Sequence, residues 1–323
     1  MRVLVTGGAG FIGSHLCERL VGEGHDVTVI DDLFTGSRQN LARGAEFVRH
    51  DVCEPFHVEC DVLLHLACPA SPVHYQRNPV RTIKTAVQGT IHALECARDA
   101  NAVIVIASTS EVYGSPLRSP QVETDWGNVN PVGIRACYDE GKRCGEALAV
   151  SWAHQYGTEV RIARIFNTYG PRMASGDGRL IPNLITQALA GEKVTVYGDG
   201  LQTRSLCYVT DTADALVKLS QCKTRDGIVP LCNVGNPDER TILSIARDVL
   251  RACGRDEGDV EFLPLPEDDP QQRLPDVTRI RVQAQWEPTT SYEEGLARTV
   301  AYFRGISQKA HVHDLRPHSS SVG

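Results

Sequence analysis

The sequence predicts an α/β protein: a doubly wound parallel sheet with helices on both faces, followed by a smaller C-terminal α/β substrate domain. Three observations carry this prediction. The chain opens with a strand-like run, a glycine-rich turn, a helix-like run and a second strand-like run. Strand-like and helix-like runs then alternate up to about residue 170, which is typical of parallel sheets with crossover helices. After Asn167, glycine-rich loops separate the remaining helices, which indicates a second unit.

The first thirty residues predict a dinucleotide site. A strand at residues 2–6, the turn GGAGFIG at 7–13, a helix at 14–23 and a strand at 26–30 lead to Asp31. This order is that of a Rossmann unit, in which glycines let the backbone approach a pyrophosphate and the helix N-terminus favours its charge. Asp31 is placed to bond the adenosine ribose and repel a 2′-phosphate, so NAD is favoured over NADP. Arg38 lies nearby in the sequence and leaves NADP open.

Further units bring polar side chains to one edge of the sheet. Strands are expected at residues 61–67, 102–107 and 159–166, and helices at residues 80–98 and 138–156. In the first of these helices, the predicted buried face consists of Ile83, Val87, Ile91 and Leu94. The strand at 102–107 leads into Ser108-Thr109-Ser110-Glu111, at the edge where ligands bind in open parallel sheets.

Tyr138 and Lys142 form a candidate catalytic pair. They stand four residues apart, so on a helix they share one face. An ammonium beside a phenol favours the phenolate and lowers a pKa that is otherwise ~10. The spacing therefore predicts a proton acceptor for an alcohol that is being oxidised. Taken alone, the same spacing also fits two unrelated exposed residues, and the upstream nucleotide site favours the catalytic interpretation.

The second unit is predicted to be discontinuous. Helices are expected at residues 180–190 and 242–253, while a helix at 209–220 and a strand at 232–235 return to the large sheet. We therefore expect a cofactor domain and a mainly substrate-binding domain, with a disordered tail. Their expected bounds are residues 1–170 with returning segments at about 205–235, residues 171–308, and residues 309–323.

Composition argues against several other classes of protein. The net charge is −7 with no basic block, so the electrostatic footprint of nucleic-acid binding is missing. The eleven cysteines are scattered without a Cys-x-x-Cys pair, which predicts reduced thiols and no metal site. Neither a signal-like N-terminus nor an apolar run of ~20 residues is present. We expect a cytoplasmic protein with neither a membrane nor a nucleic-acid partner.

Several motifs together resemble the extended short-chain dehydrogenase/reductase family, whose members act on nucleotide sugars. The glycine turn, Thr109, Tyr138 and Lys142 carry this resemblance. A closer resemblance, over about residues 1–305, is to the UDP-glucuronate decarboxylases (UDP-xylose synthases). It rests on residues 65–72, 108–114, 135–143, 164–172, 197–204 and 268–275. The resemblance implies that NAD-dependent decarboxylation converts UDP-glucuronate to UDP-xylose through a 4-keto-hexuronic acid, with NAD regenerated in each cycle. It also implies a homodimer packed through the helices at 80–98 and 138–156.

The resemblance further implies site residues. The expected catalytic residues are Thr109, Glu111, Tyr138, Lys142 and Arg273. The expected cofactor-binding residues are Gly7, Gly10, Phe11, Ile12, Gly13, Asp31, Asp32, Thr35, Gly36, Asp51, Val52, Leu66, Ala67, Thr85, Tyr138, Lys142 and Thr168. The expected substrate-binding residues are Lys84, Glu111, Asn167, Arg179, Asn183, Tyr197, Gln202, Arg204 and Arg273, with Arg179 and Arg204 near the pyrophosphate. By spacing alone, Glu111 could be a helix N-terminal carboxylate, and Arg273 could pair with Asp268, Asp269 or Asp276.

Related activities remain as alternatives. A UDP-apiose/xylose synthase also decarboxylates and would make a branched sugar besides xylose. A 4,6-dehydratase of this family carries Asp-Glu after the threonine, where this chain has Ser110-Glu111, and a 4-epimerase does not need Glu111 or the Arg273 segment. A silent nucleotide-sugar-binding regulator would be expected to lose the tyrosine or the lysine, and this chain keeps both.

Overall fold

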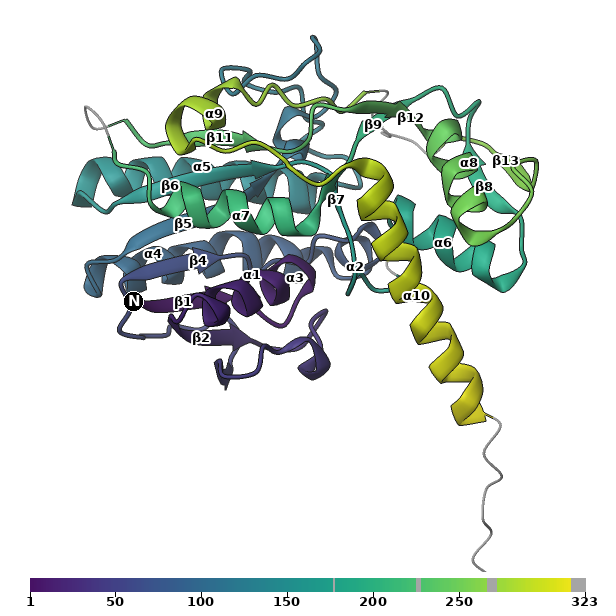
Figure 1. The fold of residues 1–323 in the computed structure, drawn as a ribbon. Helices are drawn as coiled ribbons and strands as arrows, with labels where there is room; N and C mark the ends of the chain where they lie inside the picture. The colour runs from purple at the N-terminus through teal and green to yellow at the C-terminus, as the bar shows by residue number, and fades with distance from the viewer. Residues whose placement is uncertain (177, 225–227, 266–271, 315–323) are drawn as a thin grey trace, which may run out of the picture.

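A seven-stranded parallel sheet forms the centre of the computed structural model, which describes residues 1–176, 178–224, 228–265 and 272–314, with side chains to residue 308 (Figure 1). The strand order is β11-β6-β5-β4-β1-β2-β3. The strands are β1 (Arg2–Thr6), β2 (Asp26–Asp31), β3 (Glu46–Arg49), β4 (Val62–His65), β5 (Val103–Thr109), β6 (Val160–Ile165) and β11 (Leu231–Val234). The order reverses between β1 and β4, so the predicted doubly wound sheet is confirmed, with its ligand crevice expected at this point.

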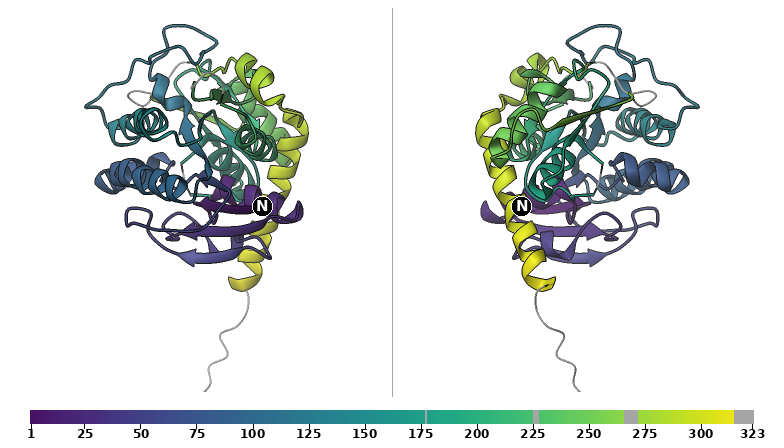
Figure 2. Two further views of the ribbon diagram at one scale, coloured as in Figure 1. Left: turned by 90° about the vertical axis from the view of Figure 1, so that its left-hand side faces the viewer. Right: turned by 90° about the vertical axis from the view of Figure 1, so that its right-hand side faces the viewer.

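Helices cover both faces of the sheet. On one face, α1 (Phe11–Gly22) packs beside α7 (Val209–Ser220); on the other lie α4 (Thr90–Asp99) and α5 (Ala136–Tyr156). Because strand side chains alternate, Val3 and Val5 join the core under α1 and α7, whereas Leu4 joins the core under α4 and α5. Figure 2 shows the blue and teal helices on one side of the sheet and the green and yellow segments on the other.

The helix predicted at residues 80–98 is interrupted by a π-helical turn. It consists of α3 (Pro79–Lys84), η2 (Thr85–Gly89) and α4, preceded by the short α2 (Pro72–Arg77). A π turn holds one residue more than an α turn and rotates the face that follows. The predicted buried face is therefore wrong at Ile83, which is 40% exposed, and right at Leu94, which is fully buried. Small buried residues such as Ala86 stand on the buried face instead of Ile83 and let α5 approach closely.

Residues 209–234 rejoin the large sheet, as predicted. Helix α7 packs against α1, and β11 pairs with β6 at the edge of the sheet. Residues between β6 and α7, together with residues after β11, build a second unit of helices and two-stranded pairs. Its helices are α6 (Leu180–Ala190), α8 (Ile242–Cys253) and α10 (Tyr292–Asp314), whereas α9 (Thr278–Ala284) packs on α7. Its short strands form three pairs: β7 (Thr168–Tyr169) with β10 (Cys207–Tyr208), β8 (Val194–Tyr197) with β13 (Val260–Leu263), and β9 (Thr203–Ser205) with β12 (Glu239–Thr241).

Helix α8 shows why these helices form where the sequence predicts them. Thr241 caps its N-terminus by accepting a hydrogen bond from the Ser244 amide at 3.1 Å, and Gly254 ends it in the left-handed conformation. Apolar residues spaced three and four apart, such as Ile245 and Val249, are completely buried. They meet α6 and α10 in a core separate from those of the sheet.

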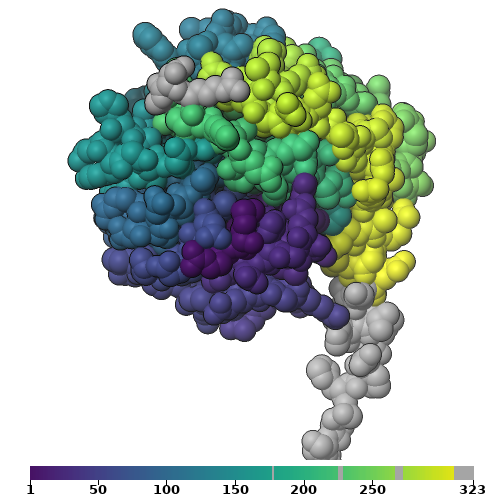
Figure 3. Space-filling view, turned by 60° about the vertical axis from the view of Figure 1, so that its left-hand side comes forward, coloured from purple at the N-terminus to yellow at the C-terminus, as the bar shows by residue number. Residues whose placement is uncertain are grey.

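The C-terminal helix differs from the prediction. Helix α10 runs down one edge of the molecule (yellow in Figure 3) and continues to Asp314, so residues 309–314 are helical where disorder was expected. Burial of Leu296, Val300 and Phe303 anchors the first turns, and a helix once nucleated extends at little cost. The rest of the predicted tail lies outside the described residues. None of the described helices is long and apolar enough to cross a bilayer.

Candidate active site

A cavity of about 1180 Å³ lies at the carboxyl ends of the strands, between the sheet and the second unit. Its walls come from the glycine turn after β1, the ends of β2, β4 and β5, helix α5, and the segment from α6 to β9. Almost all predicted site residues line it. Two do not: Gly36, which packs against Asp31 and Ala9, and Lys84, which is exposed to solvent on α3. The position of Lys84 therefore gives no support to its expected role in substrate binding.

The glycine turn is too tight for any other residue at two positions. Gly7 has φ +76°, and a Cβ there would lie 2.8 Å from the Ala67 amide nitrogen. A Cβ on Gly13 would lie 2.2 Å from the Gly7 carbonyl oxygen. The backbone and the start of α1 can thus come close to a ligand, as a pyrophosphate at a helix N-terminus requires. The residues present fit a dinucleotide.

Two carboxylates, Asp31 and Asp32, line the cavity where the sequence predicts the adenosine ribose. Asp31 accepts hydrogen bonds from the amides of Ala9 (3.0 Å) and Leu33 (2.8 Å), and its burial raises its pKa. Asp32 pairs with Arg81, a lining residue that sequence reasoning missed. Arg38, which left NADP open, lies over the Phe47 ring at 5.2 Å and is not among the lining residues. Carboxylates at this end favour NAD over NADP, because they would repel the 2′-phosphate of NADP.

The predicted catalytic pair lies on α5, but the predicted pKa shift is wrong. Tyr138 is buried, and this burial raises its pKa well above 10; Cys68 raises it further, while a hydrogen bond with Thr109 opposes the shift. Lys142 is also buried and donates to the Ala107 carbonyl at 2.8 Å. Burial is the largest cause because a phenolate without water is costly. The Tyr75 ring stacks on Tyr138 at 5.3 Å and 7°, which fixes the orientation of the phenol.

Glu111 lies between two guanidinium groups. Its Oε2 accepts from Arg135 Nη2 at 2.5 Å and from Arg273 Nη2 at 2.8 Å. Arg273 is only 2% exposed and also donates to the Gly114 carbonyl at 2.7 Å. Burial alone would raise the pKa of Glu111, but Arg273, Arg135 and Arg204 together lower it below its ordinary value. Glu111 is therefore an ionised carboxylate.

This arrangement shows which carboxylate pairs with Arg273, a point that the sequence left open. Arg273 pairs with Glu111, and Asp276 instead accepts from the Thr278 amide at 2.7 Å. Asp268 and Asp269 lie outside the described residues. Sequence reasoning assigned no role to Arg135, because its only signal was its place in the stretch 135–143, and no spacing rule connects it with Glu111.

Apart from Lys84 and Glu111, the expected substrate residues line the cavity from the segment that follows β6. Gln202 Nε2 donates to the Tyr197 carbonyl at 2.6 Å, and the Arg179 guanidinium lies 5.4 Å from the centroid of Phe11, a residue of the glycine turn. Arg204, expected near the pyrophosphate, is close enough to Glu111 to lower its pKa. Asn167 and Asn183 complete this wall.

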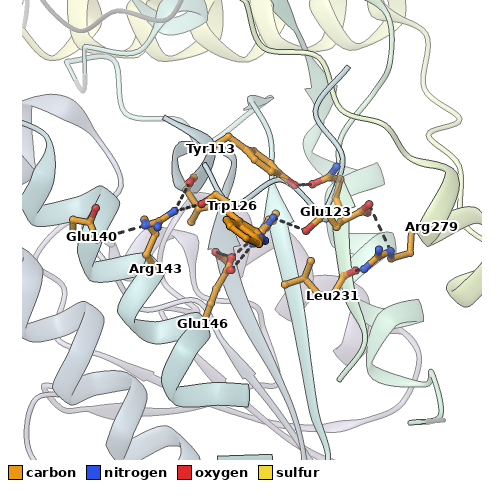
Figure 4. A network of polar contacts seen from close by, with 12 residues as sticks. Tyr113, Glu123, Trp126, Glu140, Arg143, Glu146, Leu231 and Arg279 are labelled. Carbon is orange, nitrogen blue, oxygen red and sulfur yellow. Dashed lines mark hydrogen bonds and ion pairs between the residues drawn. The ribbon is translucent and has the colours of Figure 1, made fainter. Parts of the chain in front are cut away.

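A polar network behind the site holds the segment between β5 and α5 (Figure 4). Tyr113 Oη donates to Asn233 Oδ1 at 2.6 Å, and the Asn233 amide donates to Glu123 Oε1 at 2.8 Å. Arg143 Nη1 donates to the Trp126 carbonyl at 2.5 Å. The segment ends at Arg135, the N-cap of α5, so the network positions one of the two partners of Glu111.

Comparisons with known proteins show the family of this chain. The model of the NAD dependent epimerase/dehydratase family matches residues 3–235. UDP-glucuronic acid decarboxylase 1 of Arabidopsis thaliana is 51% identical over 309 residues, which cover 94% of this chain and 70% of that protein. The protein of the same name from Xenopus tropicalis is 47% identical over 308 residues, with 94% and 72% covered.

Solved structures extend the likeness to the whole fold. UDP-glucose 4-epimerase of Thermotoga maritima, solved with UDP-glucose, has a TM-score of 0.87 and 29% identity, covering 95% of this chain and 100% of that one. A dTDP-glucose 4,6-dehydratase of Streptomyces venezuelae, solved with NAD, has a TM-score of 0.85 and 29% identity, covering 96% and 98%. The chain therefore belongs to the NAD dependent epimerase/dehydratase family, with NAD as its cofactor.

Proposed function

We propose that this protein removes CO₂ from UDP-glucuronate to form UDP-xylose, in a cycle that ends with NAD in its starting state. The observation that carries the proposal is an ionised Glu111 held by two arginines in the same cavity as Thr109 and Tyr138. The similarity to UDP-glucuronic acid decarboxylases over 94% of the chain supports the same reaction.

The cycle begins with removal of a proton from the C4 hydroxyl of the sugar. Tyr138 is the acceptor, and Thr109, which hydrogen-bonds Tyr138, holds the same oxygen. NAD, when bound, supplies the hydride acceptor that makes C4 ketonic and returns the hydride at the end of the cycle. A phenol with a raised pKa is a strong base once ionised, and the buried Lys142 ammonium one turn away stabilises that ionised form.

Loss of CO₂ follows from the position of the ketone. The C4 ketone is β to the C6 carboxylate, so the electron pair left on C5 is delocalised onto the C4 oxygen as an enolate. Glu111 lies near C5 and C6 with its two arginine partners. Because Glu111 already occupies both guanidinium groups, they hold the sugar carboxylate less tightly, and its loss as neutral CO₂ is easier.

The second unit supplies the remaining contacts. We infer that residues 171–308 form most of the substrate-binding domain and that residues 1–170, with the segment 205–235, form the cofactor domain. Arg179, which lies against Phe11 of the glycine turn, and Asn183, which lines the same cavity, hold the UDP part. We also infer a cytoplasmic protein, because all eleven cysteines are free thiols in the described chain, as a reducing compartment requires.

A single incubation tests the proposed activity. Purified protein is mixed with UDP-glucuronate and NAD without added reductant, and the products are identified by mass spectrometry with UDP-glucose as the control substrate. The expected products are CO₂ and UDP-xylose, with UDP-glucose unchanged. Intact UDP-glucuronate would contradict the proposal. A branched pentose beside xylose would favour the apiose/xylose synthase, and a C4 epimer that keeps its carboxylate would favour an epimerase.

A further inference from the structure

A second cavity, of about 190 Å³, lies directly behind Glu111. Glu111, Arg135 and Arg273 line both cavities, so the two meet at this ion cluster. The smaller cavity is also lined by the exposed residues Ser115, Asn128 and Asn130, so it reaches the surface. Since a water molecule takes about 30 Å³ of liquid volume, several waters can connect solvent with Glu111.

Asp139 lines the smaller cavity but not the larger one. Its carboxyl is buried, with 7% of the residue exposed, and its Oδ1 has no hydrogen-bond partner among the described residues. Its Oδ2 lies 3.9 Å from Arg135 Nε. A buried polar atom without a partner costs free energy, so water or a transferred proton is the expected partner.

The charges around Asp139 place its proton affinity near neutrality. Burial, the neighbouring Glu111 and, more weakly, Glu140 on its own helix raise its pKa, and the net value is about 7. Arg135 at the start of the helix and Arg273 from the segment after β13 oppose the shift. Asp139 can therefore both hold and release a proton at the pH of the cell.

The proposed reaction consumes a proton that this position can deliver. UDP-glucuronate and one proton give UDP-xylose and CO₂, and the new hydrogen is bound to C5. The proton that Tyr138 takes from the C4 hydroxyl returns to the C4 oxygen when the ketone is reduced. The C5 proton must therefore enter from solvent.

We propose that Asp139 relays this proton from the smaller cavity to the ion cluster at Glu111. This inference rests on the proposed function. Protonated Asp139 gives its proton to water beside Glu111, and that water protonates C5 with the electron pair of the enolate. Water in the smaller cavity then reprotonates the Asp139 carboxylate, and bulk buffer acid neutralises the hydroxide that remains. Asp139 does not touch the sugar and acts through the cluster at Glu111.

Asp139→Asn tests the relay because it keeps the shape of the side chain and removes its proton transfer. We expect kcat to fall about 10- to 100-fold, with KM within about twofold of the wild type. Oxidation at C4 should stay fast, so reduced nicotinamide should accumulate during turnover and be seen by its absorbance. In a single turnover, CO₂ release should be faster than UDP-xylose formation. We expect the wild-type rate to fall above the pKa of Asp139, and this fall should be absent from the variant. The matched control is Asp99→Asn at the end of α4, since the exposed Asp99 pairs with Arg98 and lines neither cavity.

The outcomes separate the two proposals. Wild-type protein that does not decarboxylate UDP-glucuronate would overturn the proposed function and this inference with it. An active wild type with an unchanged rate and pH profile in Asp139→Asn would overturn the relay alone. Equal slowing of oxidation, CO₂ release and product formation would also overturn it, because that pattern marks a structural role. Should Asp139→Asn fail to fold, Asp139→Ala in the presence of acetate replaces it. Restored turnover would support the relay, and a folded protein without rescue would contradict it.

Discussion

At the scale of single residues, two neighbours on α5 face different cavities and differ in chemistry for that reason. Tyr138 faces the cofactor and sugar cavity under the Tyr75 ring, whereas Asp139 faces the smaller cavity behind Glu111. Burial raises the pKa of both side chains. Cys68 and Thr109 further shift the pKa of Tyr138, whereas Glu111 and its arginine partners shift that of Asp139. The cavity that each side chain lines, and not its residue type alone, therefore sets its proposed role.

Removing the Tyr138 hydroxyl should abolish turnover while the fold and nucleotide binding remain. In Tyr138→Phe, we expect kcat to fall by about 10²- to 10⁴-fold, because the proposed proton acceptor is lost, whereas the ring can still stack on Tyr75. Steady-state kinetics and calorimetric titration with UDP-glucuronate measure the two effects. Loss of binding or of cooperative unfolding would instead indicate a structural tyrosine.

Asp139 should also make stability depend on pH. Its pKa is about 7 in the fold and ordinarily near 3.8, so between these values the unfolded chain is ionised while the folded protein keeps the proton. Rising pH therefore destabilises the wild type across this window, by at most about 4 kcal/mol, and the effect levels off above it. Urea unfolding from about pH 5 to about pH 8 should show Asp139→Asn gaining stability relative to the wild type. A constant difference between the two proteins would contradict the raised pKa.

At the scale of elements, close helix contact aligns the catalytic face of α5. The π turn between α3 and α4 places Ala86 against α5, where a Cβ on Gly141 would lie 2.9 Å from the Ala86 Cβ. Gly141 directly precedes Lys142 and stands one turn after Tyr138. A shift of α5 at this contact would therefore move Tyr138, the proposed proton acceptor, together with Lys142.

Gly141→Val should separate these helices. We expect a loss of about 1–3 kcal/mol of unfolding free energy from overpacking, together with a lower kcat, because both catalytic side chains move. Urea unfolding and steady-state kinetics measure the change. The matched control is Gly305→Val on α10, the same change at a helical glycine where an added Cβ would meet nothing within 4 Å. Equal effects in the two variants would mean that helix propensity, and not the contact, is responsible.

At the scale of the whole molecule, the same helices leave apolar side chains uncovered. Val80 and Ile83 on α3 are 67% and 40% exposed, and Val150 on α5 is 46% exposed. The resemblance implies a homodimer packed through these helices, and exposed apolar residues at those positions fit such an interface. We keep the homodimer as a prediction.

Charge on this face should break the dimer. We expect the wild type at twice the 35.3 kDa chain mass in light scattering, and Val150→Asp at the mass of one chain, because a carboxylate would be buried without a partner. Val282→Asp on α9 is the control, since Val282 is equally apolar and exposed far from these helices. A wild type of single-chain mass would contradict the prediction.

The sequence by itself determined the order strand, glycine turn, helix, strand and acid, the ends of α6 and α8, and the delivery of Thr109 and Glu111 to the edge of the sheet. These features depend on local periodicity, caps and glycines, which act over a few residues. Only the tertiary structure decided that Glu111 pairs with Arg135 and with Arg273, 162 residues later in the chain. It also decided that Tyr138 has a raised and not a lowered pKa. Pairing between distant segments and the removal of water depend on what packs over a side chain, and no local pattern records that.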